Sequence, residues 1–309
     1  MGALYQAAGI SRQAFHSWLQ PLKLQLLRTP EDKVIEMAQD IRKHHLPGSS
    51  SREVYFYIRN KHKKYNLMLF GWGKHTFDAL CLNNRLRIEY KNFVPKTTIR
   101  GSSMFPNRIE GMKISGINQV WVSDICYIFG SNGKLVGYAT SLIDLYSRRL
   151  LGLSFSKTMH AAVTSQEVLR LALKERSRTT LKGMIVHSDG GKQYIESMFV
   201  NTLRRKGIES SMAKSCYENA FAEAFNDILK NHMLSDMNIN SFPQLKKQER
   251  FIKNCYNRNR PHNSIQRMTP VEFEQHVLKL QPSQRIILEI KVIEQNLNPK
   301  SQSLTVHQV

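Results

Sequence analysis

Residues 119–158, which read QVWVSDICYIFGSNGKLVGYATSLIDLYSRRLLGLSFSKT, decide the fold class. The stretch contains three runs, 119–129, 134–147 and 148–158, that are rich in apolar, β-branched and aromatic residues. The turn signals GSNGK and SRR separate these runs, and both connections are short. Successive strands joined by short turns run antiparallel, so the pattern predicts a three-stranded meander.

After the meander, helical periodicity alternates with short apolar runs as far as residue 234. The expected segments are a helix at 164–176, a strand at 183–190, a helix at 197–207, a strand at 208–213 and a helix at 219–234. This order of elements predicts an α/β fold in which one mixed sheet carries helices on its faces.

The first third of the chain has a different period. Residues 26–92 contain three segments, 31–45, 51–64 and 73–87, with apolar residues at helical spacing and basic C-terminal ends. We expect a small all-α, helix-turn-helix-like region that contacts DNA, preceded by an N-terminal helical segment at 1–25. The alternative is an ordinary helical domain with a solvated basic surface.

The remaining boundaries follow from changes in composition. Residues 93–118 are rich in Pro, Gly and Ser and are predicted to form a linker before the α/β core at 119–275. Residues 276–309 form a C-terminal tail. Within this tail, residues 285–295 alternate weakly and could be an added edge strand or a segment that binds a partner.

The chain is strongly basic, with 45 Lys+Arg against 24 Asp+Glu and a formal net charge of +21. The excess is evenly spread: residues 1–115 hold 19 basic and 8 acidic residues, and residues 116–309 hold the other 26 and 16. Folded surfaces must therefore carry the charge. Such an excess favours a polyanionic partner, chiefly nucleic acid, over ribosome association or mere solubility.

Several classes of protein are excluded. No apolar run approaches the roughly 20 residues that cross a membrane, and the N-terminus lacks a signal-peptide core. The four cysteines are scattered and form no CxxC pair, which argues against a zinc ribbon or a disulfide scaffold. We expect a soluble cytoplasmic protein with no membrane partner.

Acidic residues are scarce in the predicted core, so their positions are informative. Only five acids occur between residues 111 and 190, and Asp124, Asp144 and Asp189 lie inside or at the end of apolar runs. Each alone could be a salt-bridge partner, a hydrogen-bonded strand acid or a turn former. Together, carboxylates from neighbouring strands suit a pair of hard divalent cations, which can promote phosphodiester chemistry. The following helix offers three candidates for a further acid: Glu218, Glu223 and Asp227.

Five motifs carry a resemblance to a known family. They are NQVWVSDICYI, LIDLYSRRLLG, VHSDGGKQY, ENAFAEAFNDILKNHML and YNRNRPHNSIQRMTPVEF, in that order between about residue 107 and residue 275. They resemble the integrase-type catalytic core of insertion-sequence transposases, in particular the second-frame protein of the IS-three family. The resemblance implies a ribonuclease-H-like fold with a mixed five-stranded sheet and flanking helices.

The resemblance also implies an Asp-Asp-Glu triad that is both catalytic and metal-binding. By motif, its members are Asp124, Asp189 and Glu223, and its cofactor is two Mg²⁺ or Mn²⁺ ions. Glu218 takes the Asp place of the family's DNAxAE motif, and Asp144 is interpreted as structural. The family usually has 35 residues between the second Asp and the Glu, whereas this chain has 33, so two residues are missing from the loop before the helix.

Four basic residues are candidates for DNA contact. Lys230 follows Glu223 by seven residues and should share its helix face, although an ordinary surface lysine is the alternative. Arg258, Arg260 and His262 lie close together in NRNRPHNSI, where helix capping or packing is an equally good interpretation for His262.

We therefore predict a DNA transposase, a polynucleotidyl transferase that cleaves and transfers strands at insertion-sequence ends by phosphodiester hydrolysis and transesterification. Its expected partners are double-stranded DNA (terminal inverted repeats and target), further copies of itself in a dimer or higher multimer, and an upstream-frame helix-turn-helix protein. The resemblance implies that the DNA strands are joined through a circular intermediate. It also implies a bacterial cytoplasmic protein that is associated with the nucleoid. The alternatives are a hydrolytic nuclease of the same fold and a non-catalytic DNA-binding protein derived from a transposase.

Overall fold

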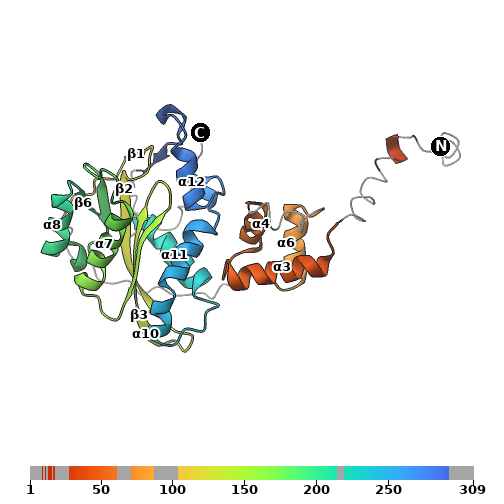
Figure 1. Cartoon of the computed structure of the whole chain (residues 1–309), viewed down its shortest axis with the longest axis horizontal. Helices are drawn as coiled ribbons and strands as arrows, with labels where there is room; N and C mark the ends of the chain where they lie inside the picture. The colour runs from red at the N-terminus through yellow and green to blue at the C-terminus, as the bar shows by residue number, and fades with distance from the viewer. Residues whose placement is uncertain are drawn as a thin grey trace, which may run out of the picture.

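The helical region and the α/β core are both present in the computed structural model (Figure 1). It describes residues 28–60, 71–86, 104–213 and 219–291, together with a few positions before residue 18. The predicted N-terminal helical segment at 1–25 therefore lies almost entirely outside the described residues. No helix in the described part of the chain is long and apolar enough to cross a membrane.

The helical domain consists of α3 (Glu31–His44), α4 (Ser51–Asn60) and α6 (Lys74–Asn83), at the three places where helical spacing predicted them. Acidic residues open α3 and basic residues close it, which complements the helix dipole. Its buried face has helical spacing and consists of Val34, Met37, Ala38 and Ile41.

The predicted meander is confirmed. Strands β2 (Val120–Phe129), β3 (Leu135–Asp144) and β4 (Leu150–Ser156) pair antiparallel in sequence order. Strands β5 (Ile185–Ser188) and β6 (Glu209–Met212) then extend the other edge of β2 in parallel. The resulting order, β4-β3-β2-β5-β6, is the mixed five-stranded sheet of the ribonuclease-H-like fold, as expected.

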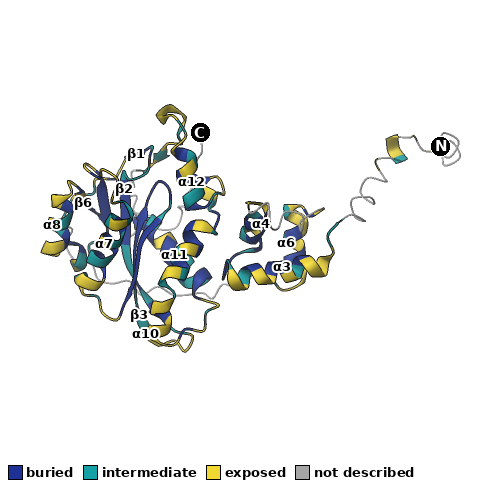
Figure 2. Cartoon of the chain, in the orientation of Figure 1, coloured by how far each residue is buried: buried dark blue, intermediate teal, exposed yellow. Residues whose placement is uncertain are grey.

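Helices cover both faces of this sheet (Figure 1). On one face lie α7 (Ser165–Glu175) and α8 (Ser197–Arg205), and on the other α10 (Phe242–Lys247), α11 (Glu249–Arg258) and α12 (Pro270–Val277). The strands are buried between these layers while the outer helix faces are exposed (Figure 2). Burial on both faces explains why β2 and β4 do not alternate strictly between buried and exposed residues. The described part of the core also contains the short 3₁₀ helices η2 (Ala161–Val163), η3 (Lys192–Tyr194), η6 (Asn263–Ile265) and η7 (Pro282–Gln284).

The segment predicted as one helix at 219–234 is divided. It begins as the α-helix α9 (Ala220–Asp227) and continues as the π-helix η5 (Ile228–Met233). The α-helical phase assumed between Glu223 and Lys230 therefore does not hold over the whole interval. π-Helical turns of this kind are frequent at functional sites.

A second, two-stranded sheet joins the predicted linker to the predicted tail. Strand β1 (Lys113–Ile114) pairs antiparallel with β7 (Leu288–Glu289), and an ion pair of 3.4 Å joins Lys113 Nζ to Glu289 Oε1. The domain boundaries at residues 118 and 275 stay predictions. However, β1 lies before the first boundary and β7 after the second, and both pack as part of the core.

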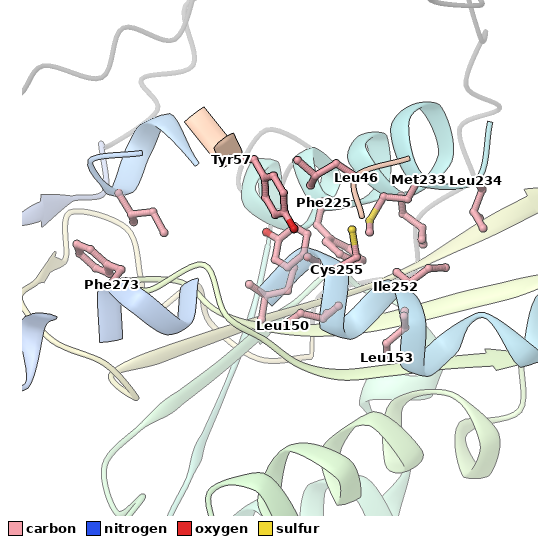
Figure 3. Close-up of a cluster of buried hydrophobic side chains, with 14 of the residues drawn as sticks. Leu46, Tyr57, Leu150, Leu153, Phe225, Met233, Leu234, Ile252, Cys255 and Phe273 are labelled. Carbon is pink, nitrogen blue, oxygen red and sulfur yellow. The ribbon is translucent and has the colours of Figure 1, made fainter. Parts of the chain in front are cut away.

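The helical domain packs against the core through a shared apolar cluster (Figure 3). Leu46 and Tyr57 from the helical domain meet Phe225, Ile252 and Cys255 from the core. Hydrogen bonds surround this cluster: the His45 carbonyl accepts from Cys255 Sγ at 3.0 Å and from Asn259 Nδ2 at 3.2 Å. These bonds and the apolar cluster together join the two domains.

Candidate active site

The parallel pairing of β2 and β5 brings two of the predicted acids together. Ser123 is opposite Ser188 in the register, so Asp124 and Asp189 follow on neighbouring strands. Asp189 comes directly after the carboxyl end of β5, where ligands bind in open α/β sheets. Both side chains are half-buried.

Helix α9 brings the third acid to the same place. Asn226 Nδ2 donates to Asp124 Oδ2 at 2.6 Å, and Asn219 Nδ2 donates to the Ser123 carbonyl at 3.2 Å. These two bonds attach α9 to β2. Glu223 lies one helical turn before Asn226, and its side chain is exposed.

The charges of the three carboxylates act on one another. The pKa of Asp124 is raised to about 7, first by burial and then by the negative charge of Asp189. Glu223 raises it further, whereas the backbone N–H of Ile125 and the charge of Lys230 act in the opposite direction. The strand arrangement thus brings the charges of Asp189 and Glu223 to bear on Asp124.

The turn after β5 is shaped around Asp189. The backbone N–H of Gly191 donates to Asp189 Oδ1 at 3.1 Å, and a Cβ at position 191 would lie 2.9 Å from that oxygen. Only glycine therefore allows this close approach without displacing the carboxylate. His187 has no comparable place in the site, because it is fully buried with Nδ1 2.9 Å from Ser211 Oγ in the neighbouring strand.

The fit of a metal ion to these residues can be tested from their charges. In the described ranges, no three acidic, histidine or cysteine side chains are already gathered as a set of ligands. However, the mutual repulsion that raises the pKa of Asp124 is what a divalent cation would relieve. Glu223 is exposed, and its charge already acts on Asp124. The residues fit a hard divalent cation, which prefers carboxylate oxygens.

Asp144, the third strand acid, belongs to a different environment. It is fully buried, and its carboxylate accepts from the backbone N–H groups of Asn118 at 2.6 Å and Ser147 at 2.8 Å. The Ser147 hydroxyl lies 2.9 Å from both Asp144 Oδ1 and Glu274 Oε1. Glu274 is ion-paired with Arg149 and Arg176. The chain itself satisfies this carboxylate, which supports its interpretation as structural.

The predicted DNA-contacting residues lie in three environments. Lys230 is half-buried on η5, near enough to Asp124 to lower its pKa, and Arg258 is exposed at the end of α11. Arg260 is buried and forms an ion pair of 2.7 Å with Glu53 of the helical domain. In this arrangement its guanidinium joins two domains and is not presented to solvent.

His262 is placed for packing. Its ring stacks edge-on against Tyr256 at 4.7 Å, and its pKa is lowered to about 3 by burial and by the charges of Arg260 and Arg148. The imidazole is therefore neutral near pH 7 and offers no positive charge to a phosphate. DNA contact by these four residues stays a prediction.

Sequence analysis did not identify two of the residues around the site. Asn226 was missed because an asparagine in an amphipathic helix gives no signal of its partner. Arg148 was missed although it lies in the SRR turn: its guanidinium lies 4.2 Å over the Phe221 ring, two residues before Glu223. Burial lowers the pKa of Arg148 to about 10, so it stays charged at pH 7 and adds a cation beside α9.

The chain is similar in sequence to known proteins of one family. Two integrase core domain families match residues 115–216 and 204–270. The transposase of insertion sequence element IS904 from Lactococcus lactis is 32% identical over 195 residues, which are 62% of this chain and 74% of that protein. An uncharacterized 31 kDa protein of insertion element IS600 from Shigella sonnei is 27% identical over 87% of this chain and 97% of its own length. Transposase InsF of IS3A from Escherichia coli is 34% identical over 52% of this chain and 55% of its own length.

Solved structures resemble the chain more distantly. The HTLV-2 integrase catalytic core domain in complex with magnesium is 15% identical, with a TM-score of 0.38 over 56% of this chain and 99% of that one. The simian T-cell lymphotropic virus intasome gives 15% identity and a TM-score of 0.43 over 82% of this chain and 81% of that one. The fold rests on the strand order, and the family rests on the sequence relatives. The chain belongs to the insertion-sequence transposases of the IS3 family, whose catalytic domain is an integrase core.

Proposed function

We propose that this transposase cleaves and joins DNA strands at the ends of an insertion sequence, with Asp124, Asp189 and Glu223 as its catalytic, metal-holding acids. One observation carries the assignment: β2 and β5 bring Asp124 and Asp189 together on neighbouring strands, where the charges of Asp189 and Glu223 both raise the pKa of Asp124. A chain with no use for this repulsion would gain stability by removing one of the charges.

Each residue around the acids has a defined task in this proposal. Asn226 orients Asp124, and the N–H of Gly191 orients Asp189. Lys230 offsets part of the negative charge and lies where a DNA phosphate would approach. Bound in pairs at such acids, Mg²⁺ or Mn²⁺ ions activate the attacking oxygen and stabilise the leaving oxygen of a phosphodiester.

The wider partners follow from the family and the charge. The proposed substrates are double-stranded terminal inverted repeats and target DNA, bound by the basic helical domain and core. The proposed active form is a dimer or higher multimer, in which an upstream-frame helix-turn-helix protein can take part. A bacterial cytoplasmic protein associated with the nucleoid would meet these partners.

The test uses the full chain, a duplex of the element end and Mg²⁺. Asp189→Asn should bring cleavage and joining below detection, because the variant loses one charge of the triad, while binding of the end stays nearly unchanged. Glu167→Gln is the matched control, since Glu167 pairs with Arg170 on α7 at 2.7 Å and should retain full activity. Cleavage by the Asp189 variant at the wild-type rate would refute the triad.

A pre-cut end separates the proposed transposase from a hydrolytic nuclease. With Mg²⁺ and a supercoiled target plasmid, the wild-type protein should join the 3′-hydroxyl end to the plasmid. If the protein only degrades the two DNAs and no joined product forms, strand transfer is refuted even though cleavage is retained.

A further inference from the structure

A basic hollow lies between the helical domain and the core, on surfaces that the triad does not use. Its volume is about 670 Å³. One wall comes from α4 and α6 and carries Tyr55, Phe56, Arg59 and Lys74. The opposite wall comes from the turn that leads into α12 and carries Arg267, with Glu272 at the edge.

The charge of this groove is strongly positive. Arg59, Lys74 and Arg267 line it, and no carboxylate in the described ranges forms an ion pair with any of the three. The one acid in the lining, Glu272, has its Oε2 engaged by the backbone N–H of Thr269 at 3.0 Å and by the Thr269 hydroxyl at 2.9 Å. Three cations against one carboxylate give the lining a net positive charge, which suits a polyanionic ligand.

Arg267 is held in place before any ligand arrives. Its guanidinium lies 4.4 Å over the Phe56 ring, and its carbonyl accepts from Asn60 Nδ2 at 3.2 Å. Gln266 and Arg267 both adopt left-handed backbone conformations, with φ of 57° and 59°. Non-glycine residues persist in this region only where the surrounding structure fixes them, and such positions cluster at functional sites.

The two walls belong to different domains, and a buried ion pair joins these domains close to the groove. Arg260 of the core pairs with Glu53 of α4 at 2.7 Å, and the contact is buried. A ligand in the groove therefore touches both domains at once, in a fixed geometry. A long ligand with evenly spaced negative charges matches cations spread over two walls better than a single small anion does.

We propose that this groove binds the phosphate backbone of double-stranded DNA and bridges the helical domain and the core on one duplex. The inference rests on the proposed function, since it names where that enzyme holds its DNA. Arg59, Lys74 and Arg267 contact phosphates in this assignment, and the stack on Phe56 positions the third of them.

The test measures DNA binding without catalysis. Full-length wild-type protein and the Arg59→Ala/Lys74→Ala/Arg267→Ala variant are titrated in EDTA against a labelled duplex of about 40 base pairs, at several KCl concentrations. Each phosphate contact contributes about 0.9 to the slope of log Kd against log salt, so the variant should lose up to about 2.7 of slope. At 0.1 M KCl its Kd should rise at least about tenfold.

The control variant removes the same charge elsewhere. Arg204→Ala/Arg205→Ala/Lys206→Ala changes three exposed cations at the end of α8, on the other side of the sheet. It should shift the slope by less than about one contact. Equal losses in the two triple variants, or an unchanged slope in the groove variant, would overturn the assignment.

Two further measurements identify the ligand and keep the test valid if the triple variant does not fold. A duplex RNA of equal length that binds as tightly as DNA, and loses the same slope in the variant, would overturn the assignment to DNA, as would full competition by millimolar inorganic phosphate. If the triple variant does not fold, Arg59→Gln/Lys74→Gln leaves the Arg267 stack intact and should lose about 1.8 of slope. Because EDTA stops catalysis, failure of this groove and failure of the triad give separate results.

Discussion

Asp124 and Asp144 lie on adjacent strands of one sheet, yet their surroundings are opposite. Asp144 is fully buried and accepts bonds from two backbone N–H groups and a hydroxyl, and its neighbour Glu274 is held by two arginines. Asp124 is half-buried beside two further carboxylates, with Asn226 as a side-chain donor. Burial raises the pKa of both carboxylates, but hydrogen-bond donors surround Asp144, whereas the charges of Asp189 and Glu223 act on Asp124.

This difference is the one expected between a structural acid and the catalytic acid that we propose at Asp124. An acid that stabilises the fold accepts hydrogen bonds from nearby turns, so its carboxylate needs no ligand. An acid that binds a cation is held close to like charges, which costs stability until the cation arrives. The sequence signal, an aspartate in an apolar strand, is the same for both.

The largest effect on stability is expected at Asp144. Asp144→Ala leaves the buried N–H groups of Asn118 and Ser147 without their acceptor, which should lower the free energy of unfolding by about 2–4 kcal/mol. Urea unfolding measures the change. Glu167→Ala is the control, because its exposed pair with Arg170 is worth less than about 1 kcal/mol. A loss at Asp144 no greater than the loss at Glu167 would remove the contrast between the two acids.

The next effect tests whether the helical domain stabilises the surroundings of Asp124 but not those of Asp144. A Cβ at Gly48 would lie 1.3 Å from the backbone oxygen of His232 in η5, so Gly48→Ala must displace η5 or the helical domain. We expect a loss of about 1–3 kcal/mol and faster hydrogen exchange in α9, with little change in the turn after β3.

Gly133 provides the matched control for this substitution. Its φ of 73° is also left-handed, but nothing lies within 4 Å of a Cβ built there. Gly133→Ala should therefore show only the backbone penalty, of about 1 kcal/mol. Equal hydrogen-exchange rates in α9 for the two variants would show that the Gly48 contact does not hold α9 in place.

A smaller effect on folding, but a clear effect on activity, is expected at Asn226. Asn226→Ala removes the 2.6 Å bond to Asp124 while leaving all three acids in place. Residues that orient metal ligands typically affect affinity or activity by about 10–100-fold, so the Mg²⁺ concentration for half-maximal cleavage should rise within that range. Asn226→Asp restores an oxygen but not the N–H donor, and should not rescue the variant.

The last expected effect has the opposite sign: a gain in stability at Asp124. Its pKa rises from 3.8 to about 7 on folding, so its contribution is fully present below pH 3.8 and is lost as the pH rises to about 7. Asp124→Asn should therefore melt higher than the wild type in EDTA at pH 8, with the gap closing toward pH 4. Mg²⁺ should raise the melting temperature of the wild type but not of the variant. A variant that melts lower at pH 8 would contradict the repulsion inferred at this site.

The sequence by itself determined the elements and the candidates. Strand alternation, short turns and helical spacing predicted the meander at 119–158 and most of the later helices, because these signals depend on neighbours a few residues apart. Scarcity of acids in apolar runs selected Asp124, Asp144 and Asp189 without a structure. The family motifs then separated Asp124 and Asp189 from Asp144, a distinction that composition alone could not make.

Tertiary structure decided what each candidate does, because a side chain's charge and hydrogen bonds depend on residues far away in the sequence. Asn226 is 102 residues from the carboxylate it orients, and Glu274 is 127 residues from the Ser147 hydroxyl it contacts. The ion pair between Arg260 and Glu53 and the basic groove between the domains arise from the docking of two domains. Local periodicity carries no record of such long-range contacts, so only the folded chain shows which acid is surrounded by hydrogen-bond donors and which one lies beside other carboxylates.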